Sequence, residues 1–234
     1  MTTTLITGAN KGLGYEAARQ LVALGHTVYL GTRDPARGQR AATELGARYV
    51  HLDVTDVPSI RAAAEQVQAE GGLDVLINNA GIPGAGRTAE EVTAEVVRAV
   101  YEVNVYGPVS VLNEFLPVLR KSSNPVVVNV SSGLGSLTVA ADPEANAGAV
   151  PVWIPAPVYA SSKAALNMLT LQFARLHPEL RINTVDPGFT ATDFNGHRGN
   201  QTVEEGAEII VRLAQTPPEG PTGQYLSLTG TVPW

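Results

Sequence analysis

Short runs of β-branched and other apolar residues alternate with helix-like stretches along the chain, and this alternation most narrows the folds open to it. The run Val126–Val130 is apolar almost continuously, as expected of a strand that is covered on both faces. We predict strands over Thr3–Thr7, Thr27–Thr32, Tyr49–Leu52, Asp74–Asn78, Pro125–Ser131, Arg181–Val185 and Gln224–Leu228. We predict helices over Leu13–Leu24, Ala36–Leu45, Val57–Glu70, Ala89–Tyr101, Pro108–Arg120, Tyr159–Leu176 and Val203–Ala214. Such alternation indicates an α/β fold, a doubly wound parallel sheet with helices on both faces.

The domain organisation follows from the absence of a linker-like composition between the predicted elements. We therefore expect a single domain over residues 1–234. The segment Gly133–Pro157 is rich in Gly, Ala and Pro and fits neither helix nor strand. A loop of that length inside a compact domain usually has a functional role.

Composition and charge exclude several classes of partner. Charged residues make up 16% of the chain, against about 25% in an average soluble protein, so much of the sequence is expected to be interior. The net charge is −6 and basic residues do not cluster, which predicts neither nucleic-acid nor membrane binding. The chain has no cysteine and its four histidines are scattered, so no metal site is expected. The start Met1–Gly8 leaves no room for a signal peptide before the first strand, and we expect a cytoplasmic protein.

A glycine-rich turn follows the first predicted strand and opens the first predicted helix. Gly12, Gly14 and Ala17 satisfy G-x-G-x-x-G/A, and Gly8 adds a further small residue. Such a turn lets the backbone touch a pyrophosphate at the N-terminus of a helix. An ordinary glycine-rich turn is the alternative, but the strand-to-helix context favours a dinucleotide site of the Rossmann type.

The end of the second predicted strand bears on the choice of cofactor. An NAD site would place an acid there against the ribose 2′-hydroxyl, whereas this chain has Arg33. Arg33 suits a 2′-phosphate, and Lys11 supplies a second cation. Two alternatives stay open: Arg33 is merely solvated beside a helix start, or a shift of one residue makes Asp34 the ribose acid. NADP(H) is favoured.

Tyr159 and Lys163 stand four residues apart at the start of a predicted helix, so their side chains share one face. An ammonium group beside a phenol favours the tyrosinate and should lower the pKa of Tyr159. That would make Tyr159 a usable proton donor near neutral pH. A surface contact without function is the alternative for this pair taken alone.

Polar and small residues also gather at the carboxyl ends of three predicted strands, where open α/β sheets bind ligands. Ser131 and Ser132 follow one strand. Two other strands lead into Asn78-Asn-Ala-Gly81 and Asp186-Pro-Gly-Phe-Thr-Ala-Thr192.

These motifs in this order resemble the short-chain dehydrogenase/reductase family over essentially the whole chain. The resemblance implies that Ser132 hydrogen-bonds the substrate carbonyl, that Tyr159 is the acid/base and that Lys163 lowers its pKa and contacts the nicotinamide ribose. Asn104 resembles the asparagine that completes a water-mediated proton relay, and Ser131 the structural neighbour of the catalytic serine. Asp56 is expected only to cap a helix.

The resemblance also implies a set of cofactor contacts. Asp53 resembles the adenine contact, and Phe189 and Thr192 resemble contacts to the carboxamide. The full predicted set, besides Tyr159 and Lys163, is Gly8, Asn10, Lys11, Gly12, Leu13, Gly14, Arg33, Asp53, Val54, Asn79, Ala80, Gly81, Pro187, Gly188, Phe189, Thr190 and Thr192.

Within the family, the glycine turn, the Thr32-Arg33-Asp34 sequence and the C-terminal Pro221–Trp234 are similar to NADPH-dependent carbonyl reductases. The implied activity is reversible hydride transfer from NADPH to a small-molecule ketone or aldehyde. A 3-oxoacyl-thioester reductase and a non-catalytic NADP-sensing regulator are the alternatives. Leu134, Val152, Trp153, Ile154 and Phe194 are candidates to line an apolar substrate pocket.

Ser132 and Tyr159 are 27 positions apart, more than is common in the family, so residues 133–157 contain an insertion. Its apolar part, Val150–Pro157, is expected to fold over the helices Pro108–Arg120 and Tyr159–Leu176 and to cover the face through which related tetramers associate. We therefore expect a monomer, with a dimer as the alternative.

Overall fold

The computed structural model describes residues 1–84 and 88–234, and within them eight strands form one sheet. The spatial order is β3-β2-β1-β4-β5-β6-β7-β8; neighbouring strands are parallel except for the antiparallel pair β7–β8. The order reverses between β1 and β4, which confirms the predicted doubly wound fold. The strands are β1 (Thr3–Thr7), β2 (Thr27–Thr32), β3 (Arg48–His51), β4 (Val75–Asn78), β5 (Val126–Val130), β6 (Arg181–Val185), β7 (Tyr225–Ser227) and β8 (Gly230–Thr231). The short strand β8 was not predicted.

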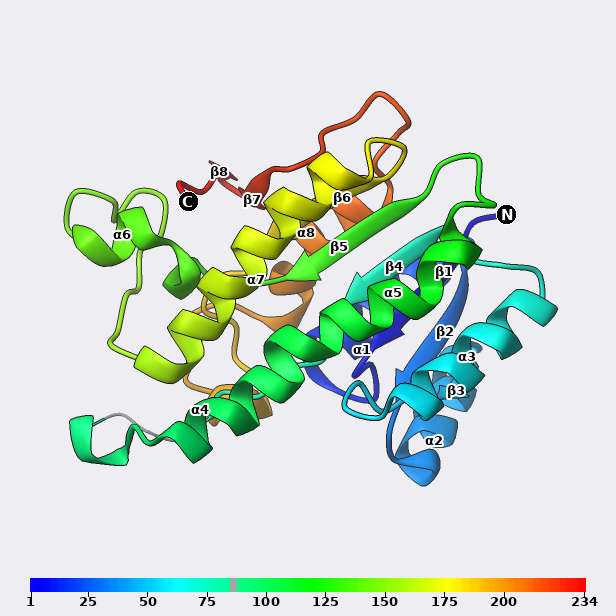
Figure 1. Cartoon of the computed structure of the whole chain (residues 1–234), viewed down its shortest axis with the longest axis horizontal. Helices are drawn as coiled ribbons and strands as arrows, with labels where there is room; N and C mark the ends of the chain where they lie inside the picture. Colours follow the sequence, from blue (N-terminus) through cyan, green and yellow to red (C-terminus); the bar gives the residue numbers. More distant parts are fainter. Residues whose placement is uncertain (85–87) are drawn as a thin grey trace.

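Helices cover both faces of the sheet (Figure 1). One face carries α1 (Gly12–Ala23), α2 (Pro35–Leu45) and α8 (Val203–Ala214). The opposite face carries α3 (Val57–Ala69), α5 (Gly107–Leu119) and α7 (Pro157–Leu176). The remaining α-helices in the described residues are α4 (Ala94–Tyr101) and α6 (Leu137–Ala141).

Successive strand residues bury their side chains on opposite faces, which gives the sheet two hydrophobic cores. In β1, Leu5 packs toward α3 and α5, whereas Ile6 packs toward α1 and α8, and both are fully buried. Tyr29 and Leu30 repeat this arrangement in β2. Burial on both faces explains why these strands are apolar at nearly every position.

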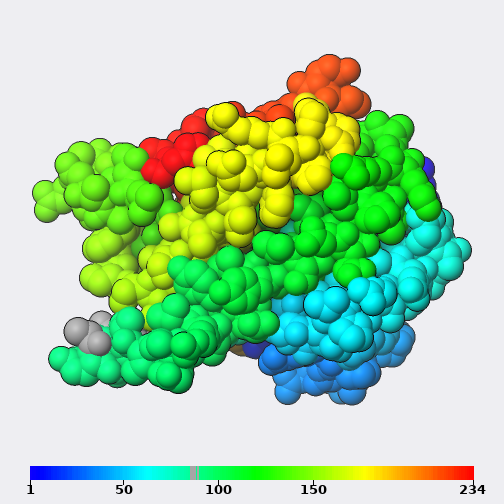
Figure 2. Space-filling view, in the orientation of Figure 1, coloured from blue at the N-terminus to red at the C-terminus, as the bar shows by residue number. Residues whose placement is uncertain are grey.

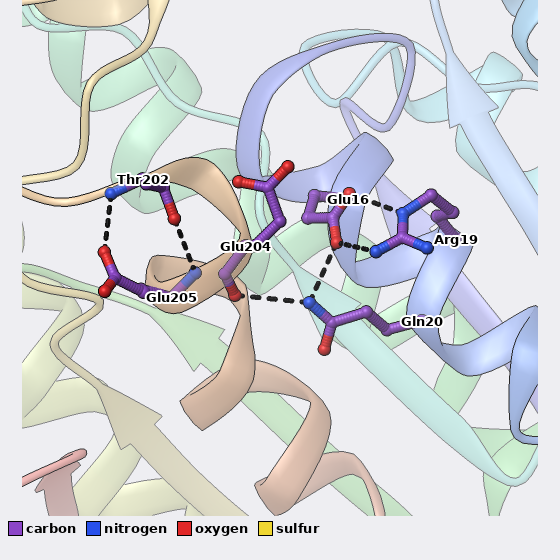
Figure 3. A network of polar contacts seen from close by, with 6 residues as sticks. All are labelled: Glu16, Arg19, Gln20, Thr202, Glu204 and Glu205. Carbon is purple, nitrogen blue, oxygen red and sulfur yellow. Dashed lines mark hydrogen bonds and ion pairs between the residues drawn. The ribbon is translucent and has the colours of Figure 1, made fainter.

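The helix that follows the glycine turn is held against α8 by a polar network (Figure 3). The buried carboxylate of Glu16 accepts hydrogen bonds from Arg19 and Gln20 on its own helix. Gln20 also donates to the backbone oxygen of Glu204, 3.2 Å away. Thr202 and Glu205 cap the N-terminus of α8 reciprocally. The network fixes the direction in which α1 presents its N-terminus.

The predicted helix Ala89–Tyr101 begins later than expected. A short 3₁₀ turn occupies Ala89–Glu91, and α4 starts at Ala94 with the Thr93 side chain as its N-cap. The chain then continues through a π-helical turn, Glu102–Tyr106, directly into α5. The expected gap between the two helices is therefore a wider helical turn that contains Asn104. Such turns frequently occur at functional sites.

The segment 133–157 is not wholly irregular, because it contains a 3₁₀ turn at Gly133–Gly135 and the helix α6. Val139, Val150 and Trp153 pack with Tyr225 and Val232 in a third, small core. The N–H of Thr138 donates to the C-terminal Trp234 carbonyl at 2.9 Å. Figure 1 shows α6 on the left, on the same side of the molecule as the C-terminus.

The expectation that this segment covers the outer surface of α5 and α7 is therefore wrong. On α7, Met168 is 55% exposed and Leu176 is 68% exposed. Both helices lie at the surface in Figure 2, in green and yellow. The segment instead packs Val139, Val150 and Trp153 against the C-terminal strands. The predicted monomer therefore needs a different physical reason.

Candidate active site

A cavity of about 1260 Å³ lies at the carboxyl ends of the central strands, where the strand order reverses. Every residue of the predicted cofactor set lines it, from Gly8 at the end of β1 to Thr192 after β6. Ser132, Tyr159 and Lys163 line it as well, whereas Asn104 lies behind its wall. This is the position at which open α/β sheets bind dinucleotides.

The glycine turn is packed too tightly at Gly8 and Gly14 to admit a side chain at either position. Gly8 has a φ of +65°, and a Cβ there would lie 2.9 Å from the Cα of Ala80. A Cβ at Gly14 would collide with the Asn79 amide. The Asn79 side chain also donates to the carbonyl of Thr7 at 2.8 Å and ties the end of β4 to the turn. The backbone is thus bare and fixed at the N-terminus of α1, as pyrophosphate binding requires.

Lys11 does not point freely into the cavity. Its Nζ lies 3.1 Å from a carboxylate oxygen of Asp193, and both side chains are largely exposed. His197 contacts the other oxygen of Asp193 at 2.9 Å. The hydrogen bonds from Lys11 and His197 lower the pKa of Asp193. An exposed pair of this kind contributes little to stability, so a bound anion can compete for Lys11.

The structure bears on one of the two alternatives at the end of β2, the role of Asp34. Asp34 is the N-cap of α2: its side chain accepts a hydrogen bond from the N–H of Arg37 and forms an ion pair with that guanidinium. Asp34 does not line the cavity, whereas Arg33 does. Among the described residues, the exposed Arg33 has no ion-pair partner. The residues at this end therefore fit a cofactor with a phosphate on its ribose.

Asp53 and Val54 line the same end of the cavity. One oxygen of Asp53 already accepts hydrogen bonds from the N–H and the hydroxyl of Thr55. Its role as an adenine contact stays a prediction. Asp56 stands at the N-cap position of α3 as expected, but its side chain makes no capping hydrogen bond.

Tyr159 and Lys163 lie on one face of α7, as their spacing predicts, with the lysine Nζ 5.6 Å from the centre of the phenol ring. Lys163 is 4% exposed and donates to the carbonyl of Val130 at 2.8 Å. Burial lowers the pKa of Lys163 to about 8. Burial also raises the pKa of Tyr159, and the nearby charge of Asp186 raises it further. The pKa of Tyr159 is therefore raised, which is opposite to the expected direction.

Ser131 and Ser132 differ in their surroundings although they are neighbours. The hydroxyl of Ser131 is buried and donates to the side-chain oxygen of Asn167 at 2.6 Å. Ser132 is half-buried, lines the cavity and is a side-chain hydrogen-bond partner of Tyr159 that acts to lower its pKa. Its hydroxyl also accepts a 3.3 Å hydrogen bond from the N–H of Leu134. Ser132 is thus the serine that faces the cavity.

Asn104 is fully buried in the π-helical turn. Its side chain binds the backbone of Ile82 and donates to the hydroxyl of Ser162 at 3.0 Å. A Cβ at Gly81 would be 3.4 Å from Asn104 and 3.7 Å from the Nζ of Lys163. Asn104 therefore fixes a cavity-lining loop close to Lys163 without reaching the cavity itself.

The turn after β6 contains contacts that the sequence did not predict. Asp186 is 7% exposed, and one of its carboxylate oxygens accepts a hydrogen bond from the N–H of Gly188 at 3.0 Å. Gln201 donates to the hydroxyl of Thr190 at 2.8 Å and to the carbonyl of Pro187. The position of Asp186, directly before Pro-Gly at a strand end, was a usable signal. No motif in the sequence around Gln201 indicated that its side chain would contact this turn.

Apolar residues line the cavity beside Tyr159. Leu134, Val152, Ile154 and Phe194 contribute to the wall, as expected, and the rings of Phe194 and Tyr159 meet edge to face at 5.5 Å. Trp153 does not line the cavity, which corrects its proposed place. It packs in the small core with Val150, because neighbouring residues of this extended stretch point in different directions.

Residues 2–203 match the family model described as short chain dehydrogenase. The chain therefore belongs to the short-chain dehydrogenase/reductase family, as the sequence motifs predicted. Proteins of this kind are oxidoreductases, and the similar ones include enzymes with carbonyl and alcohol substrates.

Particular relatives cover nearly the whole chain. The (+)-neomenthol dehydrogenase of Arabidopsis thaliana is 36% identical over 95% of both chains. The carbonyl reductase [NADPH] 1 of Pongo abelii is 34% identical over 100% of this chain and 99% of its own. The solved structure of salutaridine reductase from Papaver somniferum has 30% identity and a TM-score of 0.84, and covers 96% of this chain and 99% of that one.

The described residues, 1–84 and 88–234, were also compared with the requirements of a metal site and of a membrane-spanning helix. No group of three or more His, Cys, Asp or Glu residues is placed to hold a metal ion there. No helix in the same residues is long and apolar enough to cross a membrane.

Proposed function

We propose that the protein is an NADPH-dependent reductase of ketones and aldehydes that also catalyses the reverse oxidation of alcohols. The observation that carries this proposal is that Ser132, Tyr159 and Lys163 line the same cavity as Arg33 and the glycine turn. The names of the related neomenthol dehydrogenase and carbonyl reductase agree with chemistry on a carbonyl or an alcohol.

NADPH, when bound, supplies the hydride that reaches the carbonyl carbon. The glycine turn would hold its pyrophosphate, and Arg33 would pair with its 2′-phosphate. Lys11 would contribute a second cation once it exchanges Asp193 for phosphate. The wall formed by Asn79, Ala80 and Gly81 would face the adenosine ribose.

Ser132 is proposed to orient the substrate by donating its hydroxyl proton to the carbonyl oxygen. Tyr159 then donates its phenolic proton to that oxygen as negative charge develops on it. The raised pKa keeps the phenol protonated across neutral pH, as a donor requires. The pKa of about 8 keeps most of Lys163 charged at pH 7, so its ammonium would stabilise the tyrosinate that remains.

Asn104 is proposed to support the return of the proton to Tyr159. It holds the loop that carries Ile82 and the hydroxyl of Ser162 next to Lys163. A proton would then pass from solvent through water to Lys163 and on to Tyr159.

The experiment is a panel of ketones and aldehydes, with NADPH consumption followed by its absorbance. We expect turnover of apolar carbonyl compounds, because the wall beside Tyr159 is apolar. The panel includes a 3-oxoacyl thioester, so preference for it would favour that alternative. Tight binding of NADPH with no turnover of any compound would favour a non-catalytic sensor and contradict the proposal.

A further inference from the structure

Asp186 and Tyr225 bind the two polar groups of a single peptide bond, the one between Ser132 and Gly133. The hydroxyl of Tyr225 donates to the carbonyl of Ser132. The N–H of Gly133 is a hydrogen-bond donor to the carboxylate of Asp186. The peptide that follows the cavity-facing serine is therefore held on both sides, by residues of β7 and of the turn after β6.

The same carboxylate holds a second segment. One oxygen of Asp186 accepts a hydrogen bond from the N–H of Gly188, 3.0 Å away, in the Pro187–Gly188 turn that lines the cavity. A Cβ at Gly133 would lie 2.8 Å from the other oxygen, so the close approach needs glycine at this position. Asp186 thus joins the end of β5 to the end of β6. We call its contacts with Gly133 and Gly188 the Asp186 bridge.

Asp186 is a buried acid without a cation partner among the described residues. The titratable groups that face it are Tyr159 from α7 and Tyr225 from β7. Burying an unpaired carboxylate is costly, and two amide hydrogen bonds offset only part of that cost. Burial accordingly raises the pKa of Asp186, whereas the hydrogen bonds from the N–H groups of Gly188 and Gly133 act to lower it.

We propose that Asp186 is a positioning residue that fixes Ser132 relative to the Pro187–Gly188 turn. Tyr225 assists by holding the Ser132 carbonyl, which also accepts a 2.8 Å hydrogen bond from the N–H of Gly135. This inference rests on the proposed function, because it assigns Ser132 and Tyr159 their parts in carbonyl reduction.

The test compares Asp186→Asn with the wild-type enzyme and with Thr184→Val. Thr184 is buried two residues earlier in β6 and donates to the Asn129 carbonyl, so its replacement perturbs the same strand without touching the bridge. In Asp186→Asn we expect kcat to fall about 10- to 100-fold while the KM for NADPH changes less than about threefold.

Tyr225→Phe is the second variant and keeps the test decisive if Asp186→Asn does not fold. It removes one hydrogen bond to the Ser132 carbonyl but no charge. We expect kcat to fall roughly 2- to 5-fold while the KM for NADPH stays unchanged. Wild-type kcat in Asp186→Asn would overturn the proposal, as would an equal kcat loss in Thr184→Val. If only Tyr225→Phe folds, wild-type kcat in that variant would overturn it.

Backbone amide resonances separate this proposal from the proposed function. The proton signals of Gly133 and Gly188 should move upfield in Asp186→Asn, because an amide oxygen or nitrogen is a weaker partner than a carboxylate. If those signals move while no carbonyl compound is turned over by the wild type, the proposed function fails and the bridge stands. If they do not move, the bridge fails whatever the activity.

Discussion

The side-chain amide of Asn104 binds both polar groups of the Ile82 backbone. Its oxygen accepts from the Ile82 N–H at 2.9 Å, and its nitrogen donates to the Ile82 carbonyl at 3.0 Å. These two hydrogen bonds resemble those that join neighbouring β-strands, although here they join a helical turn to a loop. The loop that follows β4 is thereby held at the cavity wall from the π-helical turn.

Asn104→Ala should therefore lower the free energy of unfolding and also lower kcat. The loss leaves two backbone groups of Ile82 without their partner, and we expect roughly 1–3 kcal/mol less stability in urea unfolding. Asn113→Ala, at an exposed position of α5, is the matched control and should change neither stability nor kcat appreciably. Equal stability of the two variants would show that the Ile82 contact contributes nothing.

Arg33 should determine the choice of cofactor. A charge-assisted hydrogen bond to the 2′-phosphate should give NADPH at least a ~10-fold higher kcat/KM than NADH, about 1.4 kcal/mol. Arg33→Ala should remove most of that ratio. Arg61→Ala, whose side chain pairs with Glu114 in α5, should leave the ratio unchanged. Equal kcat/KM for the two cofactors in the wild type would refute the assignment.

The low pKa of Lys163 has a consequence for stability. In the folded protein it loses its proton near pH 8, whereas the unfolded chain keeps the proton until about pH 10.4. The unfolded state binds more protons between these values, so this group makes the protein more stable as pH rises through the window. Measured against Lys163→Met, the free energy of unfolding of the wild type should increase between pH 8 and 10. A constant difference would contradict the shift.

The mass in solution tests the predicted monomer. The outer surface of α7 is uncovered, but its large exposed apolar side chains are only Met168 and Leu176, and scattered residues of this kind are normal on monomers. Light scattering after gel filtration should report a mass near 24.5 kDa. A larger mass that Met168→Lys reduces would show that the protein associates through this helix.

The fold was predictable because its signals are local. The apolar strands, the glycine turn and the i,i+4 pair of Tyr159 and Lys163 each lie within a few neighbouring residues. The helix boundary at Ala94 was missed because a 3₁₀ turn precedes the helix, and the π-helical turn at Asn104 has no pattern of its own.

The site was predictable as a set of residues but not as an electrostatic environment. The shift of the Tyr159 pKa depends on burial and on Asp186, which is 27 positions away in the sequence. The place of Trp153 depends on the C-terminal strands, with which it shares a core. Both results come from contacts between distant segments, which the spacing of residues does not report.

The most direct test of the account is single-turnover reduction by Tyr159→Phe. The variant lacks only the phenolic proton, so it should bind NADPH with wild-type affinity while carbonyl reduction falls by about 10²- to 10⁴-fold. Loss of NADPH binding would show that the hydroxyl acts in the cofactor site. Reduction at a near-wild-type rate, on any carbonyl compound that the wild type accepts, would contradict the assignment of Tyr159 as the proton donor.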